Sequence, residues 1–438
     1  MRALTLSLLL LPLAAGCGDV DEPSTDAPAT KPSTEAPAGP SAKAGADAPG
    51  AAAYEPANDP LVGGPYPAIL LAEAWFTKEN GKPVPGPARL EIFRKTPDGW
   101  QRSRLEDPDS NVFHKVMPYD GGLLSIGAEK AMVKLWKQVD GKWQATTLWE
   151  RNWGGRFQRM RDIEIGDVDG DGKDEFVIAT HDSGVVAVIE PELADGTGKG
   201  VTEMDQEPDT FVHEVEIGDL EGDGKLEFFV TPSERNKANQ SQAGMVAMYR
   251  YQDGKYVRTI IEDEPGTHAK EILAADLDGD GKSEFFSVFE AETDANKQVV
   301  KPVTIRQYRL NASGGFDKTD IMTIDDRQTR FLVHGDFDGD GREELVAAAM
   351  KSGLWFLDSE DGVTWTKTLI DDKSSGFEHA CYVADLDEDG VPELYVAADD
   401  QREVRVYTYD RSSGTWSKEV IGRLDASTIT WNIVSARL

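Results

Sequence analysis

The sequence predicts an all-β protein, a seven-bladed β-propeller that is closed by pairing of its N- and C-terminal strands. Three observations lead to this prediction: an acidic loop recurs five times, a β-type run follows each copy, and an aromatic residue opens the last strand of most units. Successive loops are separated by 52, 57, 60 and 49 residues, since they begin at Asp167, Asp219, Asp276, Asp336 and Asp385. Units of this length are typical of the four-stranded blades of a propeller.

Each copy of the loop has carboxylates at positions 1, 3, 5 and 9 and glycine at position 6, as in Asp-Val-Asp-Gly-Asp-Gly-Lys-Asp-Glu from Asp167 to Glu175. Alternating carboxylate oxygens are the ligands that calcium prefers, and glycine relieves the steric limit where the turn is tightest. An EF-hand would need a glutamate at position 12 and flanking helices, but position 12 is Ile178 here and is not acidic in any copy. Acidic surface turns without metal are the other alternative, which five matched copies make a poor explanation. We therefore predict five calcium-binding loops, each between two strands.

The remaining blades are predicted from aromatic residues and from the frame around them. Residues 112–150 keep the frame of a blade but lack most of the acids, so this blade is expected not to bind calcium. Residues 66–106 supply only three strands (68–76, 88–95 and 100–106), and residues 428–434 are predicted to supply the missing inner strand. This closure would remove exposed sheet edges. The aromatics that open the fourth strands are expected to pack between blades rather than to stack on a ligand: Trp100, Trp143, Tyr256, Phe316, Trp365 and Trp416.

The N-terminal residues are predicted to lie outside the propeller. Residues 1–16 combine Arg2, an apolar stretch and a small-residue site at Ala14-Ala15-Gly16, which is typical of a signal peptide. Cys17 follows at once; this resembles a bacterial lipoprotein signal and implies a lipid on Cys17, with ordinary secretory cleavage as the alternative. Residues 17–62 are rich in Ala, Pro and Ser and are predicted to form a disordered tether, so the propeller spans residues 63–438. We expect a protein anchored in the cell envelope, with the outer membrane favoured, or otherwise secreted.

The composition excludes one class of partner. The formal net charge of -33 argues against nucleic acid, because a phosphate backbone would be repelled; five calcium ions would bring that charge to -23. Cys381 is the only cysteine besides Cys17 and is expected to be free and buried, so no disulfide framework is predicted. No later segment has the 18 or so apolar residues of a membrane helix, so we expect contact with the membrane only through the lipid. We also expect a monomer.

The motif Asp-x-Asp-x-Asp-Gly-x-x-Glu resembles the FG-GAP/VCBS repeat family, which includes the integrin α-subunit propeller. The resemblance implies a calcium ion in the loop between the first and second strands of a blade. Glu221 replaces Asp at position 3 of the second loop, and its longer side chain is expected to weaken or reshape that site. The implied ligands are the side chains at positions 1, 3, 5 and 9 and the main-chain carbonyl at position 7: Asp167, Asp169, Asp171, Lys173 and Glu175; Asp219, Glu221, Asp223, Lys225 and Glu227; Asp276, Asp278, Asp280, Lys282 and Glu284; Asp336, Asp338, Asp340, Arg342 and Glu344; Asp385, Asp387, Asp389, Val391 and Glu393.

A basic or titratable side chain stands six residues before the first Asp of each loop, and six before Asp120 in the blade without acids. A strand rises about 3.3 Å per residue, so these side chains are expected at the opposite end of the innermost strands, around one mouth of the channel. One interpretation is that they neutralise acids, since Asp162, Glu214 and Glu271 follow three of them. The other is that they bind an anionic ligand, more weakly as pH rises through about 6.5 because three are His. The six residues are His114, Arg161, His213, Lys270, Arg330 and His379.

Two classes of function remain open. The first is a calcium-stabilised, lipid-anchored cell-surface module for binding or adhesion, whose partner is an extracellular protein or a polysaccharide such as an anionic glycan. The alternative is a carbohydrate-active enzyme similar to a polysaccharide lyase, in which the basic ring holds a uronate and a His or Lys removes a proton. The sequence contains no Gly-x-Ser-x-Gly, His-Glu-x-x-His or Walker motif. We therefore favour the binding module and assign no catalytic residue.

Overall fold

The computed structural model describes residues 61, 63–80, 82–154, 158–194, 199–207, 209–235 and 240–438. The predicted signal peptide, the lipidated Cys17 and the predicted tether other than Leu61 lie outside these residues. Where the structure describes the chain, its regular elements are all β-strands, and no helix in it is long and apolar enough to cross a membrane. The all-β prediction is confirmed.

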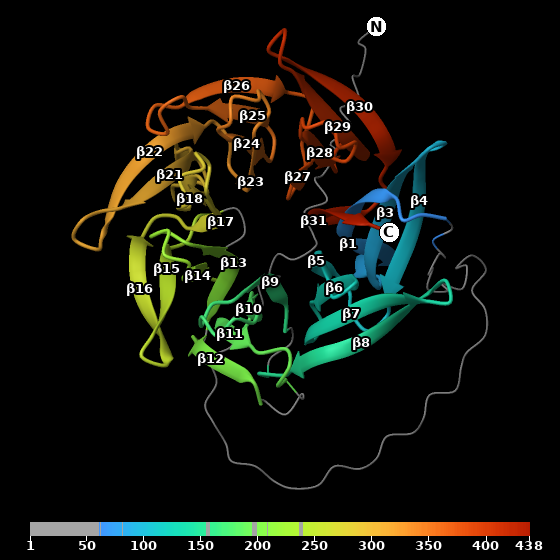
Figure 1. Ribbon diagram of the computed structural model, residues 1–438, viewed down its shortest axis with the longest axis horizontal. Coiled ribbons are helices and arrows are strands. Elements are labelled where there is room, and N and C mark those ends of the chain that lie inside the picture. The colour runs from blue at the N-terminus through green and yellow to red at the C-terminus, as the bar shows by residue number, and fades with distance from the viewer. Residues whose placement is uncertain are drawn as a thin grey trace, which may run out of the picture.

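Seven antiparallel sheets are arranged around a central axis as the blades of a propeller (Figure 1). Six of them have four strands and one has five. Blade 2 contains β5 (Phe113–Tyr119), β6 (Gly122–Gly127), β7 (Ala131–Val139) and β8 (Lys142–Arg151). Blade 3 contains β9 (Met160–Gly166), β10 (Glu175–Thr180), β11 (Val185–Ile189) and β12 (Val201–Gln206). Blade 4 contains β13 (Thr210–Gly218), β14 (Glu227–Glu234), β15 (Gly244–Gln252) and β16 (Lys255–Glu264).

The next three blades repeat the same order of strands. Blade 5 contains β17 (Ala269–Ala275), β18 (Glu284–Phe289), β21 (Val303–Leu310) and β22 (Phe316–Ile324), with a small inserted sheet of β19 (Glu292–Thr293) and β20 (Val299–Lys301). Blade 6 contains β23 (Thr329–Gly335), β24 (Glu344–Ala349), β25 (Gly353–Asp358) and β26 (Thr366–Asp371). Blade 7 contains β27 (Cys381–Ala384), β28 (Glu393–Ala398), β29 (Glu403–Asp410) and β30 (Thr415–Arg423).

Blade 1 is built from both ends of the chain, as the sequence predicted. Its strands are β31 (Thr428–Arg437), β1 (Pro67–Glu79), β3 (Ala88–Thr96) and β4 (Gly99–Asp107), with β2 (Lys82–Pro85) paired to the far end of β1. In Figure 1 the red β31 lies beside the blue β1, and Leu70 is paired with Val434. The amides of Tyr66 and Leu438 donate to each other's carbonyls at 2.7 and 3.0 Å. The C-terminal strand thus closes the ring and leaves no gap between blades 7 and 1.

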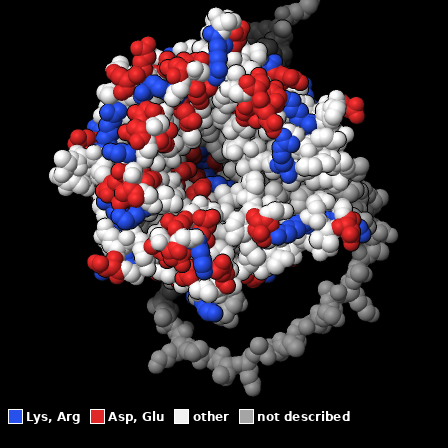
Figure 2. Space-filling model, in the orientation of Figure 1, with Lys and Arg blue, Asp and Glu red and all other residues white. Residues whose placement is uncertain are grey.

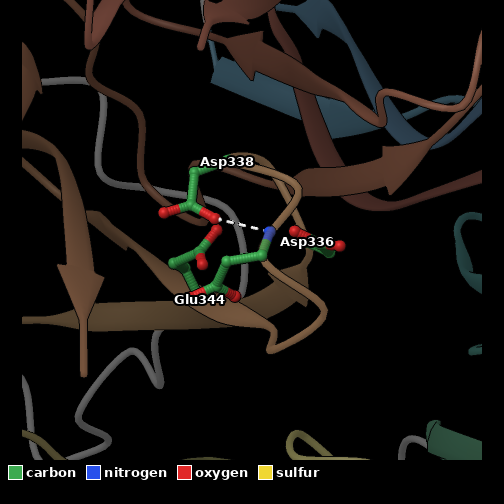
Figure 3. A group of neighbouring side chains, drawn as sticks. Asp336, Asp338 and Glu344 are labelled. Atoms are coloured by element: carbon green, nitrogen blue, oxygen red, sulfur yellow. Dashed lines mark hydrogen bonds between the residues drawn. The ribbon is translucent and has the colours of Figure 1, made fainter. Parts of the chain in front are cut away.

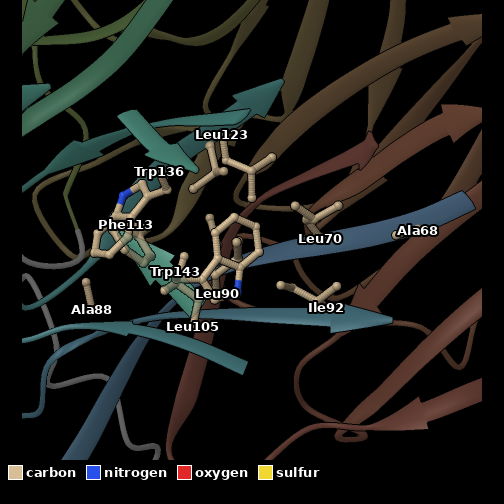
Figure 4. Packing of buried hydrophobic residues seen from close by; sticks show 12 residues of the cluster. Ala68, Leu70, Ala88, Leu90, Ile92, Leu105, Phe113, Leu123, Trp136 and Trp143 are labelled. Atoms are coloured by element: carbon tan, nitrogen blue, oxygen red, sulfur yellow. The ribbon is translucent and has the colours of Figure 1, made fainter. Parts of the chain in front are cut away.

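The core lies between the blades, because both faces of each blade are covered by a neighbour. Alternate residues of a strand point to opposite faces, so Leu70 packs toward blade 2 while Ile69 and Leu71 pack toward blade 7. Seven buried apolar clusters each join two adjacent blades. Figure 4 shows the cluster between blades 1 and 2, which includes Leu90 of blade 1 and Phe113 of blade 2. The second strands of the blades, such as β10, β24 and β28, are therefore buried along their whole length.

The aromatics that open the fourth strands pack between blades, as predicted. Trp416 of blade 7 meets Phe337 of blade 6 with ring centroids 5.0 Å apart, and Trp365 beside β26 meets Phe286 of blade 5 at 5.9 Å. Blade 2 replaces the nine-residue loop with a two-residue turn between β5 and β6. Asp120 and Gly121 of that turn have φ of 44° and 68°, the left-handed pair that suits a tight hairpin.

Candidate metal loops and central channel

The five predicted loops all connect the first and second strands of their blades, and they share one set of main-chain hydrogen bonds. The position-1 carboxylate accepts the amide of the glycine at position 6, for example Gly172 N to Asp167 Oδ2 at 2.9 Å. The amide at position 7 donates to the carboxylate at position 5, for example Lys173 N to Asp171 Oδ1 at 3.0 Å. The position-6 glycines have φ between 80° and 90°, which explains why only glycine occurs there.

The glutamate at position 9 links each loop to its blade. Its Oε2 accepts the amide of position 2 in all five loops, at 2.8 to 3.2 Å. The side chain at position 2 is buried and belongs to the apolar cluster shared with the next blade. These anchors, which the sequence analysis missed, are Val168, Leu220, Leu277, Phe337 and Leu386. An apolar residue at position 2 of every copy was the signal that could have revealed them.

Four of the five loops bring at least three carboxylates close enough to share an ion. The ligand atoms lie within 4.8 Å of one another in each group. Figure 3 shows the loop of blade 6, where the carboxylates of Asp338 and Glu344 point toward each other. Such oxygen-only sets suit a hard divalent cation such as calcium. The four groups are Asp167, Asp169 and Glu175; Asp276, Asp278 and Glu284; Asp336, Asp338, Asp340 and Glu344; and Asp385, Asp387, Asp389 and Glu393.

Few cations balance the charges of these groups: among the described residues Lys95 pairs with Asp387 and Arg342 lies 3.9 Å from Asp278, and the groups of blades 3 and 6 make no ion pair. Burial, together with Asp338, Asp358 and Asp336, raises the pKa of Glu344 to about 8. Burial and the neighbouring loop carboxylates likewise raise the pKa of Glu175 to about 7. A carboxylate resists ionisation when other negative charges lie close by, and a bound cation would remove that penalty. The residues present therefore fit the predicted metal.

The second loop, residues 219–227, keeps the backbone pattern but does not bring its carboxylates together in this way. A guanidinium lies there instead: Arg250 Nε is 2.8 Å from Glu227 Oε1, and Arg250 Nη2 is 3.3 Å from Glu221 Oε1. Arg250 follows Tyr249, the cross-strand partner of Phe228. The corresponding residue in blade 6 is Asp358, which follows the partner of Leu345. Four of the five predicted loops thus form a compact group, and the exception is the loop whose site Glu221 was expected to weaken or reshape.

The six basic or titratable residues lie at the beginning of the inner strands, at the end opposite the loops, and all are buried. Arg161 Nη2 lies 3.2 Å from Glu214 Oε1 of the next blade and 3.7 Å from Glu378 Oε2 near blade 7. Arg330 pairs with the same Glu378 and with Glu290. These ion pairs support the interpretation that the cations neutralise acids. The ligand-binding role of the ring stays a prediction.

The other members of the ring contact neutral groups. Lys270 Nζ lies 2.8 Å from His213 Nδ1, and burial lowers the pKa of Lys270 to about 7. Burial also lowers the pKa of His114 to about 3 and that of His379 to about 4, and it holds the pKa of His213 well below the usual range. The expected titration near pH 6.5 is therefore wrong for these histidines, because the protein interior disfavours their charged form.

A cavity of about 1060 Å³ occupies the central channel and is lined by the inner strands of all seven blades. Figure 2 shows the hollow at the centre of the molecule, with acidic and basic side chains visible inside it. His114 and Arg161 of the predicted ring line this cavity, whereas His213, Lys270, Arg330 and His379 do not. Cys381, free and buried as predicted, also lies at its wall.

The model of the FG-GAP-like repeat family matches residues 167–230, 219–287 and 336–396, which together contain all five loops. No curated protein matches the chain in sequence. Similar solved structures include a candidate 6-phosphogluconolactonase from Bacteroides fragilis, with 15% identity, a TM-score of 0.52 and coverage of 86% of this chain and 100% of that chain. A second from Bacteroides uniformis has 12% identity, a TM-score of 0.52 and coverage of 85% and 100%.

A mutant apocarotenoid oxygenase from Synechocystis is also similar, with 9% identity, a TM-score of 0.53 and coverage of 88% of this chain and 94% of that chain. Identities this low establish a shared propeller fold and nothing about chemistry.

Proposed function

Because the chain carries FG-GAP-like repeats on a closed seven-bladed propeller, we propose that it is a calcium-stabilised binding module displayed outside the cell. The observation that supports this most is the link between the loops and the blade interfaces. In each loop the position-9 glutamate holds the amide of a residue whose side chain enters the next interface, as Glu344 does for Phe337 at 2.9 Å. A cation held by the loop would therefore stabilise the interface. Calcium sites of extracellular modules bind at about 10⁻⁴–10⁻³ M, which suits this setting.

The partner we propose is an extracellular protein. The sequence was equally consistent with an anionic glycan as the partner, because the predicted ring of basic residues could bind one. However, Arg161 and Arg330 of that ring are already paired with Glu214, Glu290 and Glu378. The formal net charge of -33 further favours a partner with positive charge over an anionic one.

The predicted polysaccharide-lyase-like enzyme has less support. A lyase needs a base that faces a cleft. The pKa of Lys270 is lowered to about 7 by burial, as a base would require, but this side chain is buried against His213 and does not line the cavity. The arrangement therefore favours a module that recognises its partner without chemistry of its own.

The binding function is tested by presenting the purified full chain to an array of glycans and to fractionated extracellular proteins, with 2 mM calcium and with chelator, which are conditions on the order of the expected affinity. We expect capture of a protein partner that is lost with chelator. Calcium-dependent capture of a glycan would replace the proposed partner class, and no calcium-dependent capture of either kind would contradict the proposal.

We further propose that a lipid on Cys17 anchors the module in the cell envelope, most readily in the outer membrane. This rests on the sequence pattern around Cys17 alone. Replacing Cys17 with Ser should move the protein from the membrane fraction to the soluble fraction after cell disruption, without changing its melting temperature. Retention of the Cys17→Ser variant in the membrane fraction would contradict the anchor.

A further inference from the structure

Ion pairs cross the central channel at the end opposite the loops. Arg161 belongs to blade 3 and Glu378 precedes blade 7, so their ion pair at 3.7 Å reaches across the axis between blades that are not neighbours. Glu378 also pairs with Arg330 of blade 6, and all three side chains are buried. The cavity of about 1060 Å³ therefore has a buried ion-pair cluster at the end opposite the loops. Its size is slightly above the range of about 300–1,000 Å³ that is typical of small-molecule pockets.

One wall of this pocket carries more acids than bases. Five carboxylates come from β9, β13 and β17, and two permanent cations lie among them. Lys115 Nζ is 2.9 Å from Asp162 Oδ1 and also pairs with Glu164, while Arg161 pairs with Glu214.

Among the described residues, two acids of this wall have no cation within ion-pair distance. Among the described residues Glu216 has no ion-pair partner, and Glu271 accepts only the Leu332 amide, at 3.4 Å. Burial and neighbouring carboxylates raise the pKa of both glutamates well above the usual range. The other charged or titratable groups that line the cavity do not compensate them, since Asp120 and Asp174 are acids and His334, on the opposite wall, pairs with Glu343.

His114 offers a second, independent sign of a ligand. The side chain is more than nine-tenths buried and lines the pocket. Its Nδ1 bonds to the carbonyl of Met160, so Nδ1 carries the proton and Nε2 carries the lone pair. Among the described residues Nε2 has no hydrogen-bond partner. A neutral imidazole nitrogen in this state is an acceptor for an N–H group.

The opposite wall of the pocket is largely apolar, with His334 and Asn432 as its polar members. It is formed by Phe331 and Val333 of β23, Tyr382 of β27, and Ile433 and Val434 of β31. A bare metal ion would gain nothing from this wall. Within the described residues, moreover, the acidic groups compact enough to hold an ion all lie in the loops and none lies in the channel. The ligand that suits both walls has a positive charge at one end and an apolar stem.

We propose that the channel pocket binds an organic cation, an ammonium group on an unbranched apolar stem, as presented by a lysine side chain of a protein partner. Glu216 and Glu271 would pair with the ammonium group, His114 Nε2 would accept one of its hydrogens, and Tyr382 would cover the stem. The inference rests on the proposed binding function and names the chemistry of the partner. A free diamine offers the same chemistry, so the test includes both sources.

The test is titration calorimetry of the full chain in calcium with three probes: a lysine tripeptide blocked at both ends, the same tripeptide with norleucine in place of lysine, and 1,5-diaminopentane. We expect the lysine peptide to bind and the norleucine peptide not to bind. Glu216→Gln and Glu271→Gln should each weaken binding by about 10-fold or more, since hydrogen bonds to charged groups contribute about 1.5–3 kcal/mol. Glu419→Gln, which makes the same charge change at an exposed position of β30, should have less than a twofold effect.

The outcomes are distinguishable. Binding of the diamine alone would assign the pocket to a small molecule and overturn the lysine side chain as its occupant. Equal affinity of the Gln variants and the wild type, or no binding of either cation, would overturn the pocket altogether. If the array partner is still captured with the affinity of the wild type by both Gln variants, the binding function stands while this inference falls. Melting temperatures of all variants confirm that they fold, and removal of a repelled carboxylate should not lower them.

Discussion

Residues 336–344 and residues 219–227 form loops that share the hydrogen bonds of the position-6 and position-7 amides, yet only the first brings its four carboxylates close enough to share an ion. The first adds a further carboxylate, Asp358, from β25, and burial with these neighbours raises the pKa of Glu344 to about 8. The second has Arg250 from β15, whose guanidinium contacts Glu221 and Glu227. The same acidic frame can thus be neutralised by an external cation or by a side chain of the protein.

The comparison also shows what both loops do for the fold. Phe337 and Leu220, at position 2 of each loop, are buried in the interface with the following blade. In both loops the glutamate at position 9 accepts the position-2 amide, at 2.9 and 3.2 Å. Neutralising the glutamate is therefore a condition for a stable interface in either case. The four compact carboxylate groups, in which a lysine or arginine pairs with at most one acid, should make the fold depend on calcium.

The largest expected effect is that of removing calcium. At about 2 mM calcium and dissociation constants of about 10⁻⁴–10⁻³ M, each site adds roughly 0.7–1.8 kcal/mol, so four sites add roughly 3–7 kcal/mol. The melting temperature in a chelator should fall by roughly 4–9 °C, given the unfolding entropy expected for a domain of this size. Equilibrium dialysis should show four ions per chain. Metal analysis should confirm that the chelator has removed the calcium. If the melting temperature then stays constant, the loops do not have the proposed stabilising role. Five bound ions would contradict the prediction that residues 219–227 bind none.

The next prediction tests whether the buried residue at position 2 of a loop transmits the effect of the bound ion to the blade interface. Phe337→Ala removes a fully buried ring from the interface between blades 6 and 7, which should lower the free energy of unfolding by about 3–5 kcal/mol. Leu220→Ala, the matched change in the loop with Arg250, should cost about 2–4 kcal/mol. Denaturant unfolding with and without calcium measures both. Because the anchor couples the ion to the interface, calcium should stabilise the Phe337→Ala variant less than it stabilises Leu220→Ala. Equal calcium responses would mean that the anchors do not transmit the effect.

Much of this architecture could be predicted from the sequence, because each repeat carries its own pattern. The acidic loops, the blade without acids and the closure by residues 428–434 all follow from positions that recur along the chain. Arg250 could not be predicted, because it lies 23 residues beyond Glu227 and becomes its neighbour only through the register of β14 and β15. The pKa values of His114 and His379 depend on burial from several blades, which no local pattern shows.

The stability of the protein should depend on pH through a residue at the end of the inner strands that lies opposite the loops. Burial lowers the pKa of His379 to about 4 in the folded state, against about 6.5 when unfolded. The unfolded state therefore binds more protons, so the contribution is fully present above pH 6.5 and is lost as pH falls toward 4. Between pH 6.5 and 5 the loss is about 2 kcal/mol.

The variant His379→Asn tests this sign. Asparagine tolerates the left-handed φ of 58° at this position and does not titrate. We expect the variant to lose about 2 kcal/mol less than the wild type over that pH interval in urea unfolding. This difference between the variant and the wild type should be the same with calcium and with chelator. His379 forms hydrogen bonds with Ser374 and with the carbonyl of Ala349, and neither residue belongs to a candidate metal loop. A difference that disappears in chelator would place the titration in the loops instead.

The smallest expected effect concerns residues 219–227, the loop whose carboxylates contact Arg250. Arg250→Ser removes the guanidinium and leaves Glu221 and Glu227 facing each other without a cation. Because Arg250 is 21% exposed at its side chain, solvent screening limits the cost to about 1–2 kcal/mol. In chelator the variant should therefore be less stable than the wild type. In calcium the deficit should shrink, and the ion count should rise from four to five, because the loop keeps the backbone that holds Asp219 and Asp223 in the common arrangement. If calcium leaves the loss of stability unchanged, Glu221 alone prevents ion binding in this loop. The double variant Glu221→Asp/Arg250→Ser should then bind the fifth ion. If neither variant binds it, the difference between the two loops lies in their backbone after all.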